Sequence, residues 1–276
     1  MRIEWSHLNK VYASKNHPRS RRIGLLDFTA AARKGITAIL GPEGSGKSTL
    51  LQLTAALQVP DDGRITYQLE DGETVIWSRG RAAAAGTSAL GNLKSRMIYI
   101  PPMRRMNHSI SLEKYLLYRA QLSQLPYPRR RVAELIAEWG LAAVRRASLS
   151  AIPGEMVKRV LLVEMLLRDP LIALLDEPTA GLDHWGKRLL WRELRRLAPH
   201  RIILVATRDL RWAECADDLL LMESGTCRRM GPKKLLTANV PEGTVAAWYE
   251  MMQTFANHRS RSRRAGLIAE RREKGY

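Results

Sequence analysis

The feature that most constrains this fold is a glycine-rich segment, Gly41–Thr49 (GPEGSGKST), set between two regular patterns. The residues before it, Ile36–Leu40 (ITAIL), form an apolar run of strand length, and the residues after it, LLQLTAAL, have helical spacing. The pattern G-x-x-x-x-G-K-S between a strand and a helix is typical of a P-loop, whose backbone N–H groups surround phosphate oxygens. The alternative is an accidental glycine turn, and the register of strand, lysine, serine and helix argues against it.

Each residue type in this segment suits a task in phosphate binding. The glycines allow the backbone to curl around a phosphate, and the helix that begins near Lys47 adds the positive end of its dipole. We expect Lys47 to neutralise the β- and γ-phosphates of a nucleotide and the Ser48 hydroxyl to be a Mg²⁺ ligand. The candidate nucleotide-binding residues of the loop are Gly41, Pro42, Glu43, Gly44, Ser45, Gly46, Lys47, Ser48 and Thr49.

A second pattern, Leu171–Pro178 (LIALLDEP), is an apolar strand that ends in two carboxylates. A buried parallel strand delivers such residues to the carboxyl edge of the sheet, where doubly wound folds bind ligands. We expect Asp176 to hold the metal and Glu177 to orient and polarise the attacking water as general base. Paired acids at a strand end are often turn residues, but downstream of a P-loop a catalytic role is the better interpretation.

The remaining patterns predict an α/β fold with a mainly parallel core sheet, an antiparallel β side sheet and a helical lobe at about residues 103–168. Strand signals vanish between Ser111 and Leu167, and the ordered core is expected to end near residue 240. The expected strands are Arg2–Trp5, Ile36–Leu40, Ile65–Leu69, Thr74–Trp77, Met97–Ile100, Leu171–Leu175, Ile202–Ala206 and Leu219–Met222, the last followed by a turn and a short polar strand.

Charge and composition restrict the partners. Lys plus Arg number 45 and Asp plus Glu number 27, which gives a formal net charge of +18 and favours an anionic partner such as a nucleotide, a nucleic acid or lipid headgroups. A solvated basic surface is the alternative. Cys215 and Cys227 lack a nearby histidine pair, which argues against a zinc site. The apolar runs are too short to span a bilayer, so we expect a cytoplasmic chain, peripheral to a membrane only through other contacts.

Taken together, these residues resemble the nucleotide-binding subunit of an ABC transporter over residues 1–240. The resemblance is strongest at DEPTAGLD, Asp176–Asp183, whose last four residues match the family's D-loop with its aspartate at Asp183. It also includes Tyr12 in LNKVY, which matches the aromatic residue that stacks on adenine. Short subunits of multidrug or antibiotic exporters are the most similar relatives. The resemblance implies a P-loop NTPase of ABC type with ATP and Mg²⁺ as cofactors, and it makes residues 241–276 a basic C-terminal extension.

The chain departs from the family's pattern in three places. Pro102 stands where the Q-loop glutamine is expected, and a proline side chain does not ligate Mg²⁺. Arg208 occupies the place of the switch histidine and is a candidate catalytic residue, because a guanidinium can stabilise phosphate charge. The counterpart of the Leu-Ser-Gly-Gly signature is Ile152, Pro153, Gly154 and Glu155, in which only one glycine survives.

The resemblance favours an ATP-hydrolysing subunit that drives transport through separate transmembrane permease subunits and dimerises with a second nucleotide-binding subunit. We expect slow hydrolysis by the chain alone, because Glu155 would bring a carboxylate close to a γ-phosphate. A nucleotide-gated regulatory subunit paired with an intact homologue is the alternative that the substitutions favour. An ATPase acting on nucleic acid is less favoured, since a long coiled-coil insertion and a second P-loop are missing. An anionic membrane surface at the inner face of the cell membrane is a further expected partner.

Overall fold

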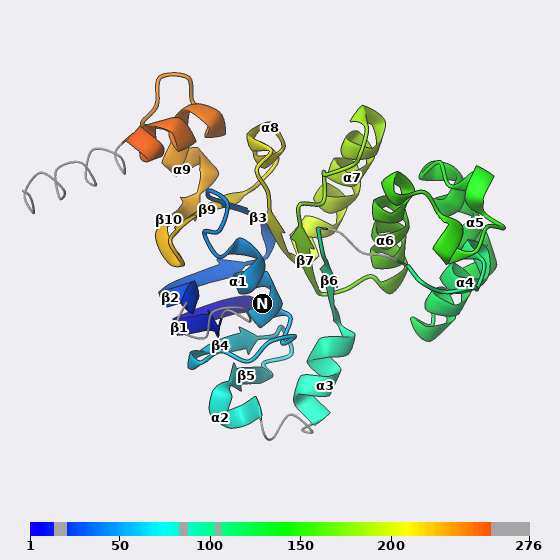
Figure 1. The fold of residues 1–276 in the computed structure, drawn as a ribbon, viewed down its shortest axis with the longest axis horizontal. Helices are drawn as coiled ribbons and strands as arrows, with labels where there is room; N and C mark the ends of the chain where they lie inside the picture. The colour runs from blue at the N-terminus through cyan, green and yellow to red at the C-terminus, as the bar shows by residue number, and fades with distance from the viewer. Residues whose placement is uncertain (14–20, 83–87, 103–105, 255–276) are drawn as a thin grey trace, which may run out of the picture.

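The computed structural model describes residues 1–13, 21–82, 88–102 and 106–254; the basic residues after Asn257 lie outside these ranges. Its strands form a four-stranded antiparallel sheet in the order β2-β1-β4-β5 and a six-stranded, mainly parallel sheet in the order β10-β9-β3-β8-β7-β6 (Figure 1). The predicted fold class is confirmed. The strands are β1 (Arg2–Ala13), β2 (Arg21–Arg33), β3 (Gly35–Leu40), β4 (Asp62–Gln68), β5 (Thr74–Ser78), β6 (Met97–Ile100), β7 (Ile172–Asp176), β8 (Ile202–Ala206), β9 (Asp218–Glu223) and β10 (Thr226–Pro232).

The parallel sheet aligns the carboxyl ends of its central strands. β8 lies between β3 and β7, and Ala206 is in register with both Ile39 and Asp176. The glycine-rich segment starts directly after β3, at Gly41, and the acidic pair stands at the end of β7. Strand pairing therefore brings the two sequence patterns to one edge of the sheet.

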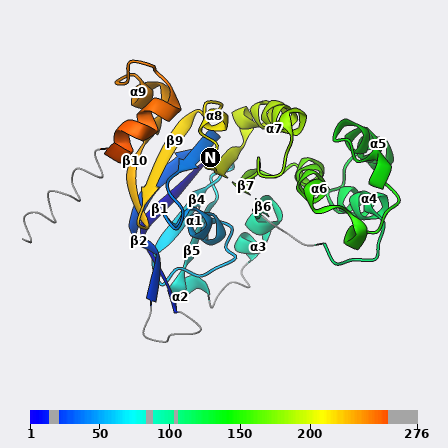
Figure 2. The ribbon, with the colours of Figure 1, turned by 45° about the horizontal axis from the view of Figure 1, so that its top comes forward.

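The helices form two groups. α4, α5 and α6 make up the helical lobe, which Figures 1 and 2 show at the end of the molecule opposite α9. The remaining helices accompany the two sheets. The helices are α1 (Lys47–Thr54), α2 (Arg79–Ala82), α3 (Ser88–Ser95), α4 (Leu112–Leu122), α5 (Pro128–Glu138), α6 (Gly154–Arg168), α7 (His184–Leu197), α8 (Leu210–Ala213) and α9 (Lys233–Thr237).

The two faces of the parallel sheet belong to different hydrophobic cores. Alternate residues of β7 face opposite cores. Ile172 and Leu174 pack with α1 and the antiparallel sheet, whereas Ala173 and Leu175 pack with α6, α7 and the helical lobe. This alternation follows from the period of two along a strand. Asp176 continues the first set, so its side chain projects toward the face that carries α1.

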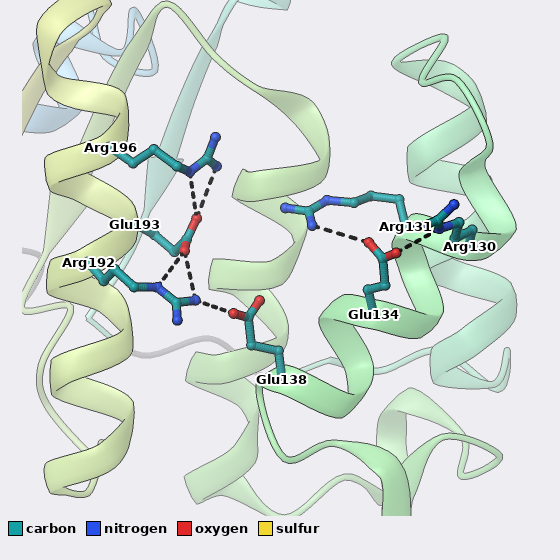
Figure 3. Close-up of polar contacts among 7 residues, drawn as sticks. All are labelled: Arg130, Arg131, Glu134, Glu138, Arg192, Glu193 and Arg196. Atoms are coloured by element: carbon teal, nitrogen blue, oxygen red, sulfur yellow. Dashed lines mark hydrogen bonds and ion pairs between the residues drawn. The ribbon is translucent and has the colours of Figure 1, made fainter.

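An ion-pair cluster joins the helical lobe to α7 (Figure 3). Arg192 of α7 contacts Glu138 at the end of α5 and also donates to Glu193, whose side chain is only 6% exposed. Arg196, one turn further along α7, donates two hydrogen bonds to the second oxygen of Glu193. The lobe is thus tied to the sheet-bearing part by charge as well as by apolar packing.

Packing continues past residue 240, where the sequence analysis expected the ordered core to end. Residues 245–254 are helical, and both Val245 and Trp248 are buried in the core that includes α7. The backbone N–H of Val245 donates to a carboxylate oxygen of Glu214 at 2.5 Å. Tyr249, Met251 and Met252 are partly buried against the same core, so this helix packs along several of its side chains.

Candidate nucleotide-binding site

The glycine-rich loop requires glycine at two of its positions. Gly41 has φ 148°, and a Cβ placed there would lie 2.2 Å from the carbonyl oxygen of Met222. Gly46 has φ 101°, and its Cβ would lie 2.3 Å from the carbonyl oxygen of Gly24. L-residues with a side chain rarely adopt such angles, and these contacts are closer than packing allows. The loop is therefore held in its curled form by β2 and β9, and α1 begins immediately after Gly46 at Lys47.

Lys47 lies inside this curl. Its ammonium donates to the carbonyl oxygens of Gly41 at 2.7 Å and Pro42 at 2.9 Å, and the residue is 8% exposed. Burial lowers the pKa of Lys47 from its usual value, and the nearby Glu177 carboxylate opposes this shift. Ser48, the next residue, is exposed at the start of α1. A cation and a hydroxyl thus stand together at a helix N-terminus, which is an arrangement suited to phosphate.

The acidic pair divides into a buried and a half-buried carboxylate. Asp176 is 2% exposed, and one of its oxygens accepts a hydrogen bond from the Tyr99 hydroxyl at 3.2 Å. Glu177 has φ 45° and its N–H donates to the Ala206 carbonyl at 2.8 Å, so the chain turns sharply there. Positive φ is uncommon for a residue with a side chain and occurs often at functional sites. The turn directs Glu177 toward the loop that follows β8.

Arg208 connects the acidic pair to the glycine-rich loop. Its guanidinium lies 3.3 Å from the Glu43 carboxylate and 3.6 Å from the Glu177 carboxylate. Its backbone N–H also points at Glu177, at 3.3 Å. The structure therefore brings together three of the residues singled out in the sequence, Glu43, Glu177 and Arg208, and the guanidinium lies beside the loop that would hold a phosphate.

The residues present fit a Mg²⁺ ion. Mg²⁺ takes oxygen ligands and is usually held by one or two protein groups together with substrate phosphates. Ser48 offers a hydroxyl and Asp176 a carboxylate at the same edge of the sheet. Among the residues that the structure describes, no group of three or more His, Cys, Asp or Glu could hold a metal ion.

Tyr12 lies beside the glycine-rich loop, at the end of β1. Its ring packs on Gly24, where a Cβ would lie 2.7 Å from the ring. Its hydroxyl donates to Gln58 at 2.7 Å and lies 3.3 Å from the hydroxyl of Thr49. The ring is thus held in place from its hydroxyl end, next to the first turn of α1, with part of its surface open to solvent.

The counterpart of the signature faces a different hollow. α6 starts at Gly154, and a cavity of about 550 Å³ lies between this helix start, the residues after β6 and the segment after β7. Pro102, Ile152, Glu155 and Gly181 all contribute to its wall; within the described chain, none of the lining residues belongs to the glycine-rich loop. The structure therefore does not bring the signature counterpart to its own phosphate loop.

Asp183, which we expected in a D-loop, contributes to the packing within this chain. Asp183 caps α7 by accepting from the N–H of Gly186 at 2.7 Å, and it also accepts from Arg159 of α6 at 2.8 Å. The capping hydrogen bond and the Arg159 guanidinium hold the pKa of Asp183 below its usual value. The segment after β7 is thereby fixed to the helical lobe within the same chain.

Lys158 is a site residue that the sequence analysis missed. It lies one turn into α6, is 6% exposed, and donates to the carbonyl oxygens of Pro101 at 2.8 Å and Pro102 at 2.9 Å. The sequence of α6, GEMVKRVLLVEMLLR, carries several charged residues and gives no signal that singles out Lys158. Its ammonium fastens the helical lobe to the segment that follows β6.

Comparison with known families gives the assignment. The family described as "ABC transporter" matches residues 26–180, which include both the glycine-rich loop and the acidic pair. This chain belongs to the ABC transporter family. Within the described residues no helix is long and apolar enough to cross a membrane.

The relatives of this ABC chain include import and export proteins. It is 32% identical over 82% of its length to the thiamine import ATP-binding protein ThiQ of Jannaschia, of which it covers 96%. It is 30% identical over 73% of its length to the Nod factor export ATP-binding protein I of Ralstonia nicotianae, of which it covers 60%. It is 31% identical to an ABC transporter ATP-binding/permease protein of Mycobacterium tuberculosis and spans only 22% of that protein. These matches identify the chain as similar to ATP-binding subunits of ABC transporters, and they do not distinguish exporters from importers.

Solved structures show the same fold. A structure described as the ATP-binding subunit of an ABC transporter superposes on this chain with a TM-score of 0.74 at 22% sequence identity. The superposition covers 92% of this chain and 100% of that structure. A dimeric ATP-binding cassette in a post-hydrolysis state with ADP and Pi matches with a TM-score of 0.65 at 17% identity, over 83% of this chain and 98% of that one.

Proposed function

We propose that this chain is the ATP-binding subunit of an ABC transporter, which binds and hydrolyses MgATP to drive transport through separate transmembrane permease subunits. One observation carries the proposal. Lys47, Asp176 and Glu177 meet at one edge of the parallel sheet, where Arg208 spans the glycine-rich loop and the acidic pair. The relatives named as import and export ATP-binding proteins support this proposal. Their names favour a transport subunit over a regulatory subunit or an ATPase that acts on nucleic acid.

The residues divide the chemistry between them. The Lys47 ammonium and the N–H groups of the loop would hold the β- and γ-phosphates, and the Tyr12 ring would stack on adenine. Ser48 and Asp176 would hold Mg²⁺, which neutralises phosphate charge when bound. Glu177 would accept a proton from the attacking water, and Arg208 would exchange its carboxylate contacts for the γ-phosphate, whose charge it stabilises.

A second nucleotide-binding subunit completes the proposal. In a head-to-tail dimer a signature segment caps the nucleotide held by the opposite subunit. Here Pro153 and Glu155 replace the serine and glycine of that cap, while Lys47, Asp176 and Glu177 are retained. This asymmetry favours a partner with an intact signature and slow hydrolysis by this chain alone.

The charge of the chain favours a place beneath a membrane. A net charge of +18 suits docking at the inner, anionic face of a cell membrane, where each basic residue near the surface contributes about 1 kcal/mol. We propose a cytoplasmic, peripheral location in which the permease subunits supply the attachment. Residues 1–240 would then form the ATP-hydrolysing domain, and the basic extension, residues 241–276, would lie near the lipid.

The test separates binding from hydrolysis. Lys47→Ala should abolish binding of a fluorescent ATP analogue in the presence of Mg²⁺, whereas Lys114→Ala, which changes an exposed lysine of α4, should leave it intact. Glu177→Gln should retain binding and lose phosphate release. Equal affinity in the Lys47→Ala variant and the unchanged chain would rule out the proposed nucleotide site.

A further inference from the structure

A continuous line of hydrogen bonds runs beneath the proposed nucleotide site, from Tyr12 to Asp176. The Tyr12 hydroxyl donates to Gln58 at 2.7 Å, and the Gln58 amide donates to Gln52 at 2.5 Å. The Gln52 amide donates to the Tyr99 hydroxyl at 3.3 Å, and that hydroxyl donates to Asp176 at 3.2 Å.

Every link in this line has the same direction. Each glutamine accepts through its amide oxygen and donates through its amide nitrogen, and the Tyr99 hydroxyl accepts one hydrogen bond and donates the next. The phenolic hydroxyl of a tyrosine can accept one hydrogen bond and donate another, so Tyr99 passes the line on from Gln52 to Asp176. The Asp176 carboxylate can only accept, and it therefore terminates the line.

The backbone around each link is fixed. Gln52 lies one turn after Ser48 on α1, and Tyr99 lies on β6, the strand hydrogen-bonded to β7. The carbonyl of Gln58 accepts from the indole of Trp77 at 3.0 Å. All three bridging side chains are half-buried. The links thus depend on the packing of α1 between the two sheets and not on freely mobile surface groups.

We propose that Gln58, Gln52 and Tyr99 are positioning residues that couple the adenine side of the site, at Tyr12, to the metal side, at Asp176. The proposal rests on the proposed function. A base stacked on Tyr12 restrains the ring, the restrained hydroxyl orders Gln58 and Gln52, and these hold Tyr99 in the position that fixes the Asp176 carboxylate. Nucleobase contact and metal affinity therefore favour each other.

The experiment compares metal binding with and without a base. Mg²⁺ is titrated into the full chain with either a fluorescent ATP analogue or inorganic tripolyphosphate, and the apparent metal affinity is measured from the change in ligand binding. Tyr99→Phe removes the last two hydrogen bonds of the line, with Gln52 and Asp176, and Gln58→Met removes the first two, with Tyr12 and Gln52, while preserving side-chain length. The matched controls are Tyr118→Phe and Gln121→Met, which change residues exposed on α4.

Two different responses are expected. Tyr99→Phe should weaken the apparent Mg²⁺ affinity about tenfold with either ligand, because a hydrogen bond to a charged group is lost. Gln58→Met should weaken it about threefold with the ATP analogue and leave the tripolyphosphate value unchanged, because tripolyphosphate has no base to engage Tyr12. The combination of Tyr12→Phe with Gln58→Met should be no worse than either change alone.

The outcomes distinguish this proposal from the proposed function. If the unchanged chain binds neither ligand, the proposed function fails. If it binds both and Tyr99→Phe and Gln58→Met behave like their controls, the coupling is refuted. An equal effect of Gln58→Met on both ligands would also refute it, because that result would reflect local distortion and not communication from the base. Urea unfolding of each variant shows whether the fold is retained.

Discussion

The ammonium of Lys158 donates to the carbonyl oxygen of Pro102 at 2.9 Å, so this proline, which we expect at the Q-loop position, is held through its backbone. A second hydrogen bond, to Pro101, fixes the direction of the segment. Because Lys158 belongs to α6, these two hydrogen bonds tie the helical lobe to Pro101 and Pro102. In this chain a buried cation on the lobe supplies a connection at the Q-loop position, where no glutamine side chain is available.

Lys158 predicts a specific pH dependence of stability. Burial lowers the pKa of Lys158 to about 8, against the opposing influence of the Asp176 and Glu177 carboxylates. In the unfolded chain the lysine has its ordinary pKa of about 10.4. Between pH 8 and pH 10.4 the unfolded chain therefore binds more protons than the folded chain. The free energy of unfolding should therefore rise from pH 8 to pH 10 by on the order of 1 kcal/mol relative to Lys158→Met, because remaining solvent contact moderates the shift.

The measurement is urea unfolding of both proteins at pH 8 and pH 10. Lys114→Met, on the exposed side of α4, serves as the control, and its difference from the unchanged chain should be the same at both pH values. A difference between Lys158→Met and the unchanged chain that does not vary with pH would contradict the buried position of this ammonium.

Arg208→Met tests whether the guanidinium assists hydrolysis. Because Arg208 lies 3.6 Å from Glu177 and beside the phosphate-binding loop, we expect phosphate release at saturating MgATP to fall about tenfold or more, with little change in nucleotide affinity. Arg211→Met, two residues into the next helix and exposed, is the matched control. An increase in turnover would mean that the ion pair with Glu177 restrains the reaction instead.

The parts of the site that the sequence revealed are those with local patterns. Gly41 and Gly46 predict a loop whose backbone angles residues with side chains rarely adopt. The apolar strand before Asp176 and Glu177 predicts that both carboxylates lie at the carboxyl edge of a sheet. β2 was not predicted, because its buried residues Leu25, Phe28 and Ala32 have almost helical spacing. The bulges in its pairing with β1 cause this spacing, and bulges depend on the partner strand.

Non-local contacts could not be predicted. Lys158 and Glu164 both lie on α6, which packs against the sheet and the lobe and is buried on most of its surface, so charge on this helix does not mark a solvent face. Likewise Gln52 and Tyr99 meet only because α1 covers the face of the sheet to which β6 contributes. The spacing of apolar residues predicts whether a segment is a helix or a strand. It does not predict which other helix or strand packs against that segment.

The lobe contact in Figure 3 predicts non-additive stability effects. Arg192→Met and Arg196→Met should each lower the free energy of unfolding by about 0.5–1 kcal/mol, because both guanidinium groups are more than half exposed. The double change should cost about 3 kcal/mol, because it leaves the buried Glu193 carboxylate unpaired. Urea unfolding gives all three values. Arg130→Met, in an exposed pair within α5, should cost less than about 0.5 kcal/mol, and strictly additive losses would contradict the shared carboxylate.

Restoring the signature should accelerate hydrolysis by a dimer of this chain. Glu155 is exposed in the first turn of α6, where its carboxylate favours the helix but would repel a γ-phosphate held by the opposite subunit. Two like charges about 4 Å apart repel by roughly 4 kcal/mol at an effective dielectric constant near 20. Solvent and salt reduce this, so we expect Pro153→Ser combined with Glu155→Gly to raise phosphate release about tenfold. Glu155→Gln, which removes only the charge, should give part of the increase.

Protein concentration provides the control for this last experiment. If two copies form the active unit, the specific activity of the restored variant should rise with concentration, and Glu177→Gln in the same background should abolish it. An increase seen only after a homologous subunit with its own signature is added would favour the heteromeric arrangement. No increase under either condition would mean that Pro153 and Glu155 do not limit the reaction, and the slow step would then have to be sought at Pro102 or Arg208, within the site that this chain itself provides.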